Sequence, residues 1–197
     1  MSRPLTCRLV LASTSPYRKA LLERFRIPFE CTPPRVEETA LAGEEAEALA
    51  RRLARLKAED VAAARQGDVV IGSDQVAVRG TVILGKPGTA GRCVEQLCAS
   101  SGREVTFLTA AHLIDTRNGS AESHLDRTVV RFRELSADEV ARYVAADRPF
   151  DCAGGFKAES LGIALFDGIE STDPTALTGL PLVWLSGALR RAGIPVP

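Results

Sequence analysis

The 197-residue sequence predicts a mixed α/β fold, in which a twisted sheet is flanked by helices. Short β-prone segments alternate with amphipathic segments of helical length, and an Asn-Gly step lies between two long strand-like runs. Hydrophobic residues make up 45% of the chain and charged residues 25%, as is usual for globular proteins. No linker or low-complexity stretch interrupts the chain, so we expect residues 1–197 to form a single domain.

The first third of the chain predicts strand, helix, strand and helix in that order. A short β-prone run at residues 8–12 predicts the first strand. Ser15 is placed as the N-cap of a helix with Pro16 as its first residue, where the missing N–H of proline costs nothing. A second strand is expected at residues 29–32. A Pro-rich loop then leads to an Ala-, Glu-, Arg- and Leu-rich helix at residues 44–65.

The middle of the chain predicts strands followed by a helix. Residues 68–74 (DVVIGSD) are typical of a buried strand that ends at Asp74, at the edge where α/β proteins bind ligands. β-branched residues around Arg79-Gly80 predict a hairpin over residues 76–84. Thr89 is placed to begin a helix that runs to about residue 100.

Two local signals organise the last part of the chain. Asn118-Gly119 is a strong hairpin signal. Ser136 and Glu139 have the spacing of a capping box, which predicts the start of a helix. The other elements expected here are strands at 104–115, 123–133 and 161–166, and a final helix at 182–192.

Composition and charge exclude several classes of protein. The formal charge balances at 25 basic and 25 acidic residues, which argues against a nucleic-acid partner. No stretch approaches the ~20 apolar residues that span a bilayer, and the N-terminus lacks a signal-peptide pattern, so we expect no membrane partner and a cytoplasmic location. The cysteines are odd in number and scattered, which predicts reduced thiols: Cys7, Cys31, Cys93, Cys98 and Cys152.

A candidate phosphate site lies at the first strand-to-helix turn. Ser13, Ser15, Arg18 and Lys19 combine hydroxyls and cations with the positive end of a helix dipole, an arrangement that binds anions. An ordinary capped helix with basic surface residues would show the same pattern. Lys86, in a stiff Gly-Lys-Pro turn, can hold a second ammonium group in a fixed direction.

Carboxylates elsewhere suggest a metal site. Glu37 and Glu38 lie in a loop and Asp74 ends a strand, so they could share one hard divalent ion, Mg²⁺ or Mn²⁺, with substrate oxygens. A solvated acidic loop and a turn-capping aspartate are the alternatives. Lys57, in the long helix, could neutralise phosphate charge, although a single helical lysine usually faces solvent.

Seven motifs occur in chain order: ASTSPYRKALLE, PRVEET, LARLKA, IGSDQ, GKP, CAGGFKAESLG and GLPL. Together they resemble the Maf family of nucleotide pyrophosphatases over nearly the whole chain. The resemblance implies two lobes around a central cleft, a fold related to the inosine triphosphate pyrophosphatases, and a homodimer. It also implies hydrolysis of a nucleoside triphosphate substrate to the monophosphate and pyrophosphate, with a divalent cation such as Mg²⁺, Mn²⁺ or Co²⁺.

The family's motif positions match six residues of this chain: Ser13, Arg18, Glu38, Lys57, Asp74 and Lys86. Asp74 matches the proton acceptor, and the resemblance implies that Lys57 and Lys86 act with it in catalysis. Glu38 is expected to bind metal with Asp74. Four residues are expected to bind the substrate: Ser13, Ser15, Arg18 and Lys19.

Three further residues are expected to recognise the nucleobase of the substrate. Tyr17, Gln75 and Glu159 depart from the commonest family pattern and resemble the branch that prefers 7-methyl-GTP, which often has Trp where this chain has Tyr17. N7 methylation makes guanine a cation that stacks well on an aromatic face, and Glu159 can accept hydrogen bonds from N1–H and the exocyclic amine. Tyr17 could instead be a helix-surface aromatic and Glu159 a solvated loop acid.

The sequence therefore favours a 7-methyl-GTP pyrophosphatase. The alternatives are a dTTP/UTP pyrophosphatase and, from a different class, a nucleotide-binding regulator of septum formation. The presence of Asp74, Lys57 and Lys86 favours catalysis over a purely regulatory role.

Overall fold

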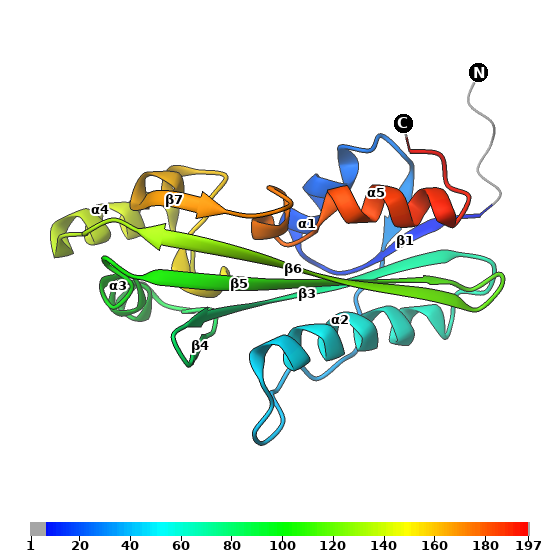
Figure 1. The fold of residues 1–197 in the computed structure, drawn as a ribbon, viewed down its shortest axis with the longest axis horizontal. Coiled ribbons are helices and arrows are strands. Elements are labelled where there is room, and N and C mark those ends of the chain that lie inside the picture. The colour runs from blue at the N-terminus through cyan, green and yellow to red at the C-terminus, as the bar shows by residue number, and fades with distance from the viewer. Residues whose placement is uncertain (1–6, 197) are drawn as a thin grey trace.

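A seven-stranded mixed sheet forms the centre of the computed structural model, which describes residues 7–196 (Figure 1). The spatial order is β2-β1-β3-β5-β6-β7, and β4 pairs with β3 beside this path. β1 runs parallel to β2 and β3, and the other pairings are antiparallel. The strands are β1 (Leu9–Ala12), β2 (Phe29–Cys31), β3 (Val69–Arg79), β4 (Val82–Leu84), β5 (Glu104–Asp115), β6 (Ser120–Phe132) and β7 (Phe166–Glu170).

Five α-helices cover the described part of the sheet, which confirms the predicted mixed α/β class. They are α1 (Pro16–Glu23), α2 (Ala46–Ala62), α3 (Ala90–Cys98), α4 (Ala137–Asp147) and α5 (Leu182–Arg191). In Figure 1, α2 lies on one face of the long strands, and α1 and α5 lie on the other. α3 and α4 pack at the far end, beside β4 and β7. One apolar core therefore joins β1, α1 and α5, and another forms around α3 and α4.

The local signals in the sequence are confirmed by the helix ends and turns. Ser15 caps α1 by accepting a hydrogen bond from the Arg18 N–H, and Pro16 is the first helical residue. Ser136 and Glu139 form both halves of a capping box at α4. Asn118-Gly119 lies in the turn between β5 and β6. These signals act within a few residues of the chain, so they survive folding unchanged.

The predicted end of the third strand at Asp74 is wrong. β3 continues to Arg79, so Asp74 lies in the middle of the strand. The reason is the long antiparallel partner β5, which pairs with β3 from Val69 to Val78. Asp74 still faces a ligand edge, because the neighbouring strand β1 ends at Ala12, opposite Gly72, while β3 runs on.

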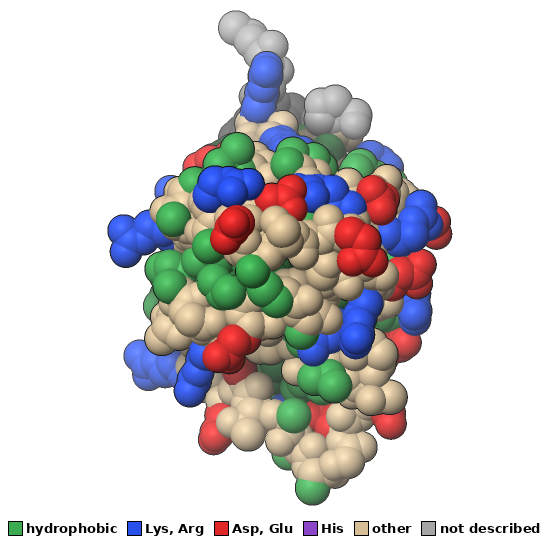
Figure 2. Space-filling model, turned by 90° about the vertical axis from the view of Figure 1, so that its left-hand side faces the viewer, with side chains coloured by type: hydrophobic (Ala, Val, Ile, Leu, Met, Phe, Trp, Pro, Cys, Tyr) green, Lys and Arg blue, Asp and Glu red, His purple; other side chains and the backbone are tan. Residues whose placement is uncertain are grey.

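The strand predicted at residues 161–166 is also wrong. Residues Leu161–Leu165 form a 3₁₀ helix, and β7 begins only at Phe166. A Cβ on Gly162 would lie 2.4 Å from the Lys157 carbonyl oxygen, so the chain is folded back tightly here. Leu161 and Ile163 are exposed. Figure 2 views this end of the molecule, where apolar side chains gather between charged ones.

Among residues 7–196, none of the helices combines the length and apolar character that crossing a bilayer requires. The prediction that the N-terminus carries no signal peptide rests in part on residues 1–6, which lie outside the described residues.

Candidate active site

A cavity of about 610 Å³ lies between the two ends of the sheet, within the size range of small-molecule sites. Parallel pairing of β1 with β3, with Ala12 opposite Gly72, brings the loop after β1 beside the middle of β3. Except for Lys19 and Glu37, all predicted site residues line this cavity: Ser13, Ser15, Tyr17, Arg18, Glu38, Lys57, Asp74, Gln75, Lys86 and Glu159. The structure places Lys19 elsewhere, with its ammonium 3.9 Å from Glu23.

The loop after β1 is ordered by its own serines. The Ser13 hydroxyl accepts a hydrogen bond from the Ser15 N–H at 3.1 Å, and the Ser15 hydroxyl accepts one from the Arg18 N–H at 3.3 Å. Both residues line the cavity where α1 begins, so the positive end of the helix dipole faces it. This geometry suits a phosphate group.

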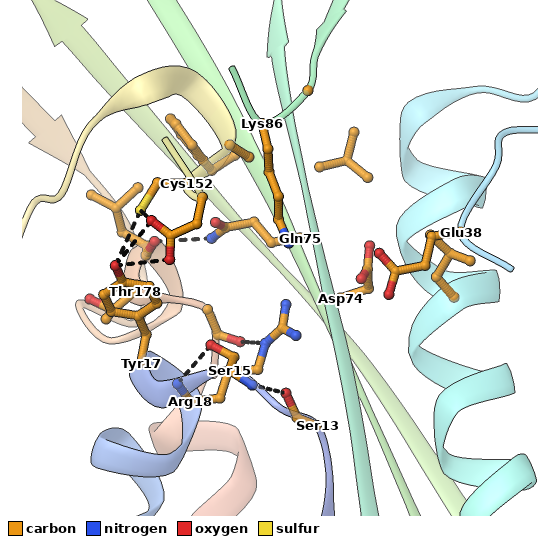
Figure 3. A pocket seen from close by; sticks show the side chains of 18 of the residues that line it. Ser13, Ser15, Tyr17, Arg18, Glu38, Asp74, Gln75, Lys86, Cys152 and Thr178 are labelled. Atoms are coloured by element: carbon orange, nitrogen blue, oxygen red, sulfur yellow. Dashed lines mark hydrogen bonds between the residues drawn. The ribbon is translucent and has the colours of Figure 1, made fainter. Parts of the chain in front are cut away.

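The orientation of the Arg18 side chain is set by a turn that is distant in sequence. Its Nε donates a hydrogen bond to the Gly179 carbonyl oxygen at 2.9 Å, which leaves the terminal guanidinium nitrogens directed into the cavity (Figure 3). The Ser73 hydroxyl donates to the same oxygen at 2.9 Å. Gly179 has φ +113°, a conformation that favours glycine. The carbonyl of this turn therefore orients the Arg18 cation.

Lys57 lies between two carboxylates. Its Nζ is 2.6 Å from Asp74 Oδ1 and 2.6 Å from Glu38 Oε1, and its side chain is only 5% exposed. Desolvation is the largest influence on the pKa of Glu38 and raises it, but the hydrogen bond and charge of Lys57, with the charges of Lys86 and Arg18, hold that pKa below its usual value. The solvent-facing alternative for Lys57 is therefore wrong.

Close packing of α2 on β3 makes this arrangement possible. Gly72 faces the helix so closely that a Cβ there would lie 2.2 Å from the Ala54 carbonyl oxygen. Because α2 approaches the strand at Gly72, Lys57 on the next helical turn reaches Asp74. Glu37, next to Glu38, does not line the cavity, and its carboxylate accepts a hydrogen bond from Thr39.

Lys86 enters the cavity from the loop after β4. The Gln96 side chain donates to the Gly85 carbonyl oxygen at 3.1 Å, and the Gly88 N–H donates to the Phe150 carbonyl oxygen at 2.9 Å. These bonds hold the Gly85–Gly88 turn against α3 and the segment after α4, so the backbone from which the Lys86 side chain extends is held in place.

Tyr17, Gln75 and Glu159 complete the predicted set. Tyr17 lies on the opposite side of the cavity from Glu38 and Asp74 (Figure 3). The Gln75 amide nitrogen donates to Thr109 Oγ1 at 2.9 Å and to the carbonyl oxygens of Ala176 and Leu177 at 3.0 Å. Its side-chain carbonyl oxygen is the atom left for a ligand.

Comparison with known proteins identifies the family. The model of the family described as "Maf-like protein" matches residues 8–192. The chain belongs to the Maf family.

Curated relatives of this Maf protein match it over nearly their whole length. It is 50% identical over 195 residues to a protein of Cupriavidus metallidurans named 7-methyl-GTP pyrophosphatase, covering 99% of this chain and 98% of that protein. A Pseudomonas aeruginosa protein of the same name is 48% identical over 189 residues, covering 96% and 98%. Among solved structures, the Staphylococcus aureus Ham1 protein shares the fold, with a TM-score of 0.52, 16% identity and coverage of 92% of this chain and 99% of that one.

The Maf cavity carries more negative than positive charge. Its charged lining residues are three cations, Arg18, Lys57 and Lys86, and four carboxylates, Glu38, Asp74, Asp151 and Glu159. A nucleoside triphosphate carries several negative charges, so its entry requires further neutralisation. Glu38 and Asp74 converge on one point, the Lys57 ammonium, and their oxygens are ligands that Mg²⁺ accepts together with substrate phosphates. Within residues 7–196, no group of three or more candidate ligands gathers. Two carboxylates are fewer ligands than a divalent ion takes, so substrate oxygens or waters would have to supply the others.

Several lining residues were missed by the sequence reasoning. Asp151 and Cys152 lie beside Tyr17, while Phe107 and Phe156 form an apolar wall with ring centroids 5.3 Å apart. Thr178 belongs to the turn that precedes Gly179. The CAGGFKAE motif includes Cys152 and Phe156, and GLPL begins at Gly179, but no local pattern reveals which side chains face a cavity.

Proposed function

We propose that this Maf protein hydrolyses 7-methyl-GTP to 7-methyl-GMP and pyrophosphate. The observation that carries the proposal is the cluster of Asp74, Lys57 and Glu38, which lies across the same cavity from Tyr17 and shares it with the cations Arg18 and Lys86. The names of the relatives agree with this substrate. Tyr17 and Glu159 do not favour the dTTP/UTP alternative, because a neutral pyrimidine gains least from an aromatic face and a nearby negative charge.

The reaction needs only positioning and charge. Asp74 accepts a proton from a water molecule, whose oxygen forms a bond to the α-phosphorus as the bond to the bridging oxygen of the β-phosphate breaks. Pyrophosphate leaves with that bridging oxygen. Arg18 and Lys86 stabilise the charge that develops on the leaving group, and Lys57 holds Asp74 in place.

Glu38 and Asp74 are the residues that would hold a divalent cation, Mg²⁺, Mn²⁺ or Co²⁺. When bound, it would neutralise phosphate oxygens and favour ionisation of the attacking water. Ser13, Ser15 and the N-terminus of α1 bind the phosphate chain through neutral donors. Lys19, whose ammonium lies by Glu23, has no part in this binding.

The proposal extends to the setting of the enzyme. We place residues 1–197 in one cytoplasmic catalytic domain that acts as a homodimer, without nucleic-acid or membrane partners. The edge strand β7 and the exposed Leu161, Ile163 and Ile169 offer a surface for a second copy. Light scattering during size-exclusion chromatography tests this: a mass of one chain contradicts the dimer.

A nucleotide panel tests the function. Pyrophosphate release from 7-methyl-GTP, GTP, UTP and dTTP is measured with each cation and with EDTA, and products are separated by chromatography. We expect the highest kcat/KM for 7-methyl-GTP, 7-methyl-GMP as product and no turnover in EDTA. The diphosphate as product would redirect the assignment to a phosphatase. Binding of nucleotides without turnover would favour the septum regulator.

A further inference from the structure

Asp151 faces the Tyr17 side of the cavity from the segment after α4. The Tyr17 hydroxyl oxygen lies 3.4 Å from Asp151 Oδ1 and 3.3 Å from Asp151 Oδ2. The Cys152 sulfur lies 3.6 Å from the Tyr17 hydroxyl oxygen. These residues are separated by 134 and 135 positions in the chain. The contact therefore joins α1 to the segment that follows α4.

The direction of this hydrogen bond follows from the acidity of the groups. Burial, and after it the neighbouring Cys152 and Asp151, raise the pKa of Tyr17 above its ordinary value. The phenol therefore stays protonated at neutral pH and donates to the carboxylate. A ring held at its hydroxyl loses rotational freedom before any ligand binds, which lowers the cost of stacking.

The carboxylates of the cavity differ in their partners. Glu38 and Asp74 both contact Lys57. Within the described part of the chain, neither Asp151 nor Glu159 has a basic side chain within ion-pair distance. Two carboxylates without a basic partner are unfavourable in a site for a polyanion unless the ligand brings a positive charge.

We propose that Asp151 is a specificity-determining residue: it holds the Tyr17 ring through its hydroxyl and adds to Glu159 a second carboxylate without a basic partner, so that the cavity selects a positively charged purine over a neutral one. This inference rests on the proposed function and explains how a tyrosine serves there. An anionic acceptor increases the electron density of the phenol, which strengthens its attraction to a cation on its face.

Binding of reaction products tests the inference without turnover. The dissociation constants of 7-methyl-GMP and GMP are measured by calorimetry for the full chain and for Asp151→Asn, which keeps the shape and removes the charge. Asp167→Asn is the matched control, since it makes the same charge change on β7, outside the cavity. We expect the preference for 7-methyl-GMP to fall about threefold to tenfold in Asp151→Asn and to stay unchanged in the control.

Two further measurements separate specificity from a structural role. Raising the ionic strength should reduce the preference of the wild-type protein more than that of Asp151→Asn, because only the former carries the charge. In a Tyr17→Phe background, Asp151→Asn should have a smaller effect, because part of it acts through the lost hydroxyl.

Three results would overturn the role of Asp151, and a fourth would overturn only the proposed function. Equal weakening of both ligands in Asp151→Asn overturns the inference and indicates a contact with ribose, which both share. An unchanged preference overturns it as well, as does a wild-type protein that binds both products equally. If the wild-type protein binds 7-methyl-GMP preferentially but hydrolyses none of the triphosphates, the proposed function fails while the role of Asp151 stands.

Discussion

At the scale of single residues, Lys57 and its two carboxylates show how burial changes what a charge can do. Lys57 is 4% exposed, and an isolated ammonium at such a position would be strongly disfavoured. Contacts of 2.6 Å to Asp74 and Glu38 offset that penalty. The ion pairs that allow Lys57 to be buried thus involve the carboxylates to which the proposed reaction assigns proton transfer and metal binding.

Asp74→Asn tests the proton acceptor. The amide keeps the shape of the side chain but cannot accept a proton from water, so we expect kcat to fall below about a tenth of the wild-type value, a loss of more than ~1.4 kcal/mol of barrier lowering. Pyrophosphate release gives kcat, and circular dichroism checks that the fold is retained. A folded variant with near-normal turnover would contradict the role of Asp74.

Glu38→Gln and Glu37→Gln form a matched pair in one loop. Glu38 lines the cavity and Glu37 does not. We expect Glu38→Gln to raise the Mg²⁺ concentration needed for half-maximal rate by about tenfold or more, since one anionic ligand is lost. Glu37→Gln should leave that concentration unchanged. Equal effects of the two substitutions would show that Glu38 binds no metal.

At the scale of elements, the contact of α2 with β3 decides where Lys57 lies. Gly72 permits the backbone of the helix to approach the strand, and the apolar side chains of α2 pack on the sheet around it. The 176–179 turn has a corresponding role on the other side of the cavity, where Gly179 orients Arg18 and Gln75 holds the carbonyl oxygens of Ala176 and Leu177. Helix and turn therefore position the two sides of the site.

Gly72→Ala tests this contact. Its Cβ would meet the Ala54 oxygen at 2.2 Å and the Ala58 nitrogen at 2.6 Å, both backbone atoms that cannot move cheaply. We expect a loss of about 1–3 kcal/mol or more in the free energy of unfolding, with a lower kcat as Lys57 withdraws from Asp74. Urea unfolding measures the first effect and pyrophosphate release the second.

Gly91→Ala is the control for that substitution. Gly91 lies in α3, and no atom lies within 4 Å of the Cβ that alanine would add. Alanine favours a helix over glycine by about 1 kcal/mol in helix interiors, so the control should unfold at an equal or higher urea concentration. Equal destabilisation of both variants would show that the close approach at Gly72 has no special role.

At the scale of the whole molecule, four apolar clusters of the described residues share one sheet, and three of them contribute side chains to the wall of the cavity. The Tyr17–Asp151 contact joins α1 to the segment after α4, and the Arg18–Gly179 contact joins α1 to the turn before α5. The charge of the chain is balanced overall, so the field at the site depends on local groups rather than on net charge.

Acid unfolding tests the surface carboxylates. Hydrogen bonds from Arg52 and the Leu41 N–H lower the pKa of Glu44 from 4.5 to about 2, and bonds from Ser136 and Arg133 do the same for Glu139. A lowered folded-state pKa gives stability that is present above the unfolded value and is lost as pH falls from about 4.5 to about 2. We expect Tm to fall in that window, and less steeply in Glu139→Gln.

Glu95→Gln is the control for the pH series. The Glu139 carboxylate accepts hydrogen bonds from the Ser136 N–H and hydroxyl and forms an ion pair with Arg133, whereas among residues 7–196 the Glu95 carboxylate has no such partner. Its removal should leave the pH dependence of Tm as in the wild-type protein, as measured by differential scanning calorimetry. The same slope in all three proteins would contradict the linkage assigned to Glu139.

The sequence by itself determined the elements whose signals are local. Ser15-Pro16, the Asn118-Gly119 turn and the Ser136–Glu139 box satisfy backbone groups within a few residues, so their consequences do not depend on distant packing. The motifs that mark the family were also readable in order. They placed nearly all candidate site residues on loops and elements that do meet at one cavity.

Only the tertiary structure decided which side chains interact there. Asp74 lies mid-strand because β5 pairs along the whole of β3, and residues 161–165 form a 3₁₀ helix because the chain folds back on Lys157. Lys57 is buried, and Asp151 meets Tyr17, through contacts between residues 17 and 134 positions apart. Such contacts depend on how closely a helix approaches a strand and on where two loops end. No local pattern carries that information, because it arises from packing between segments that are distant in the chain.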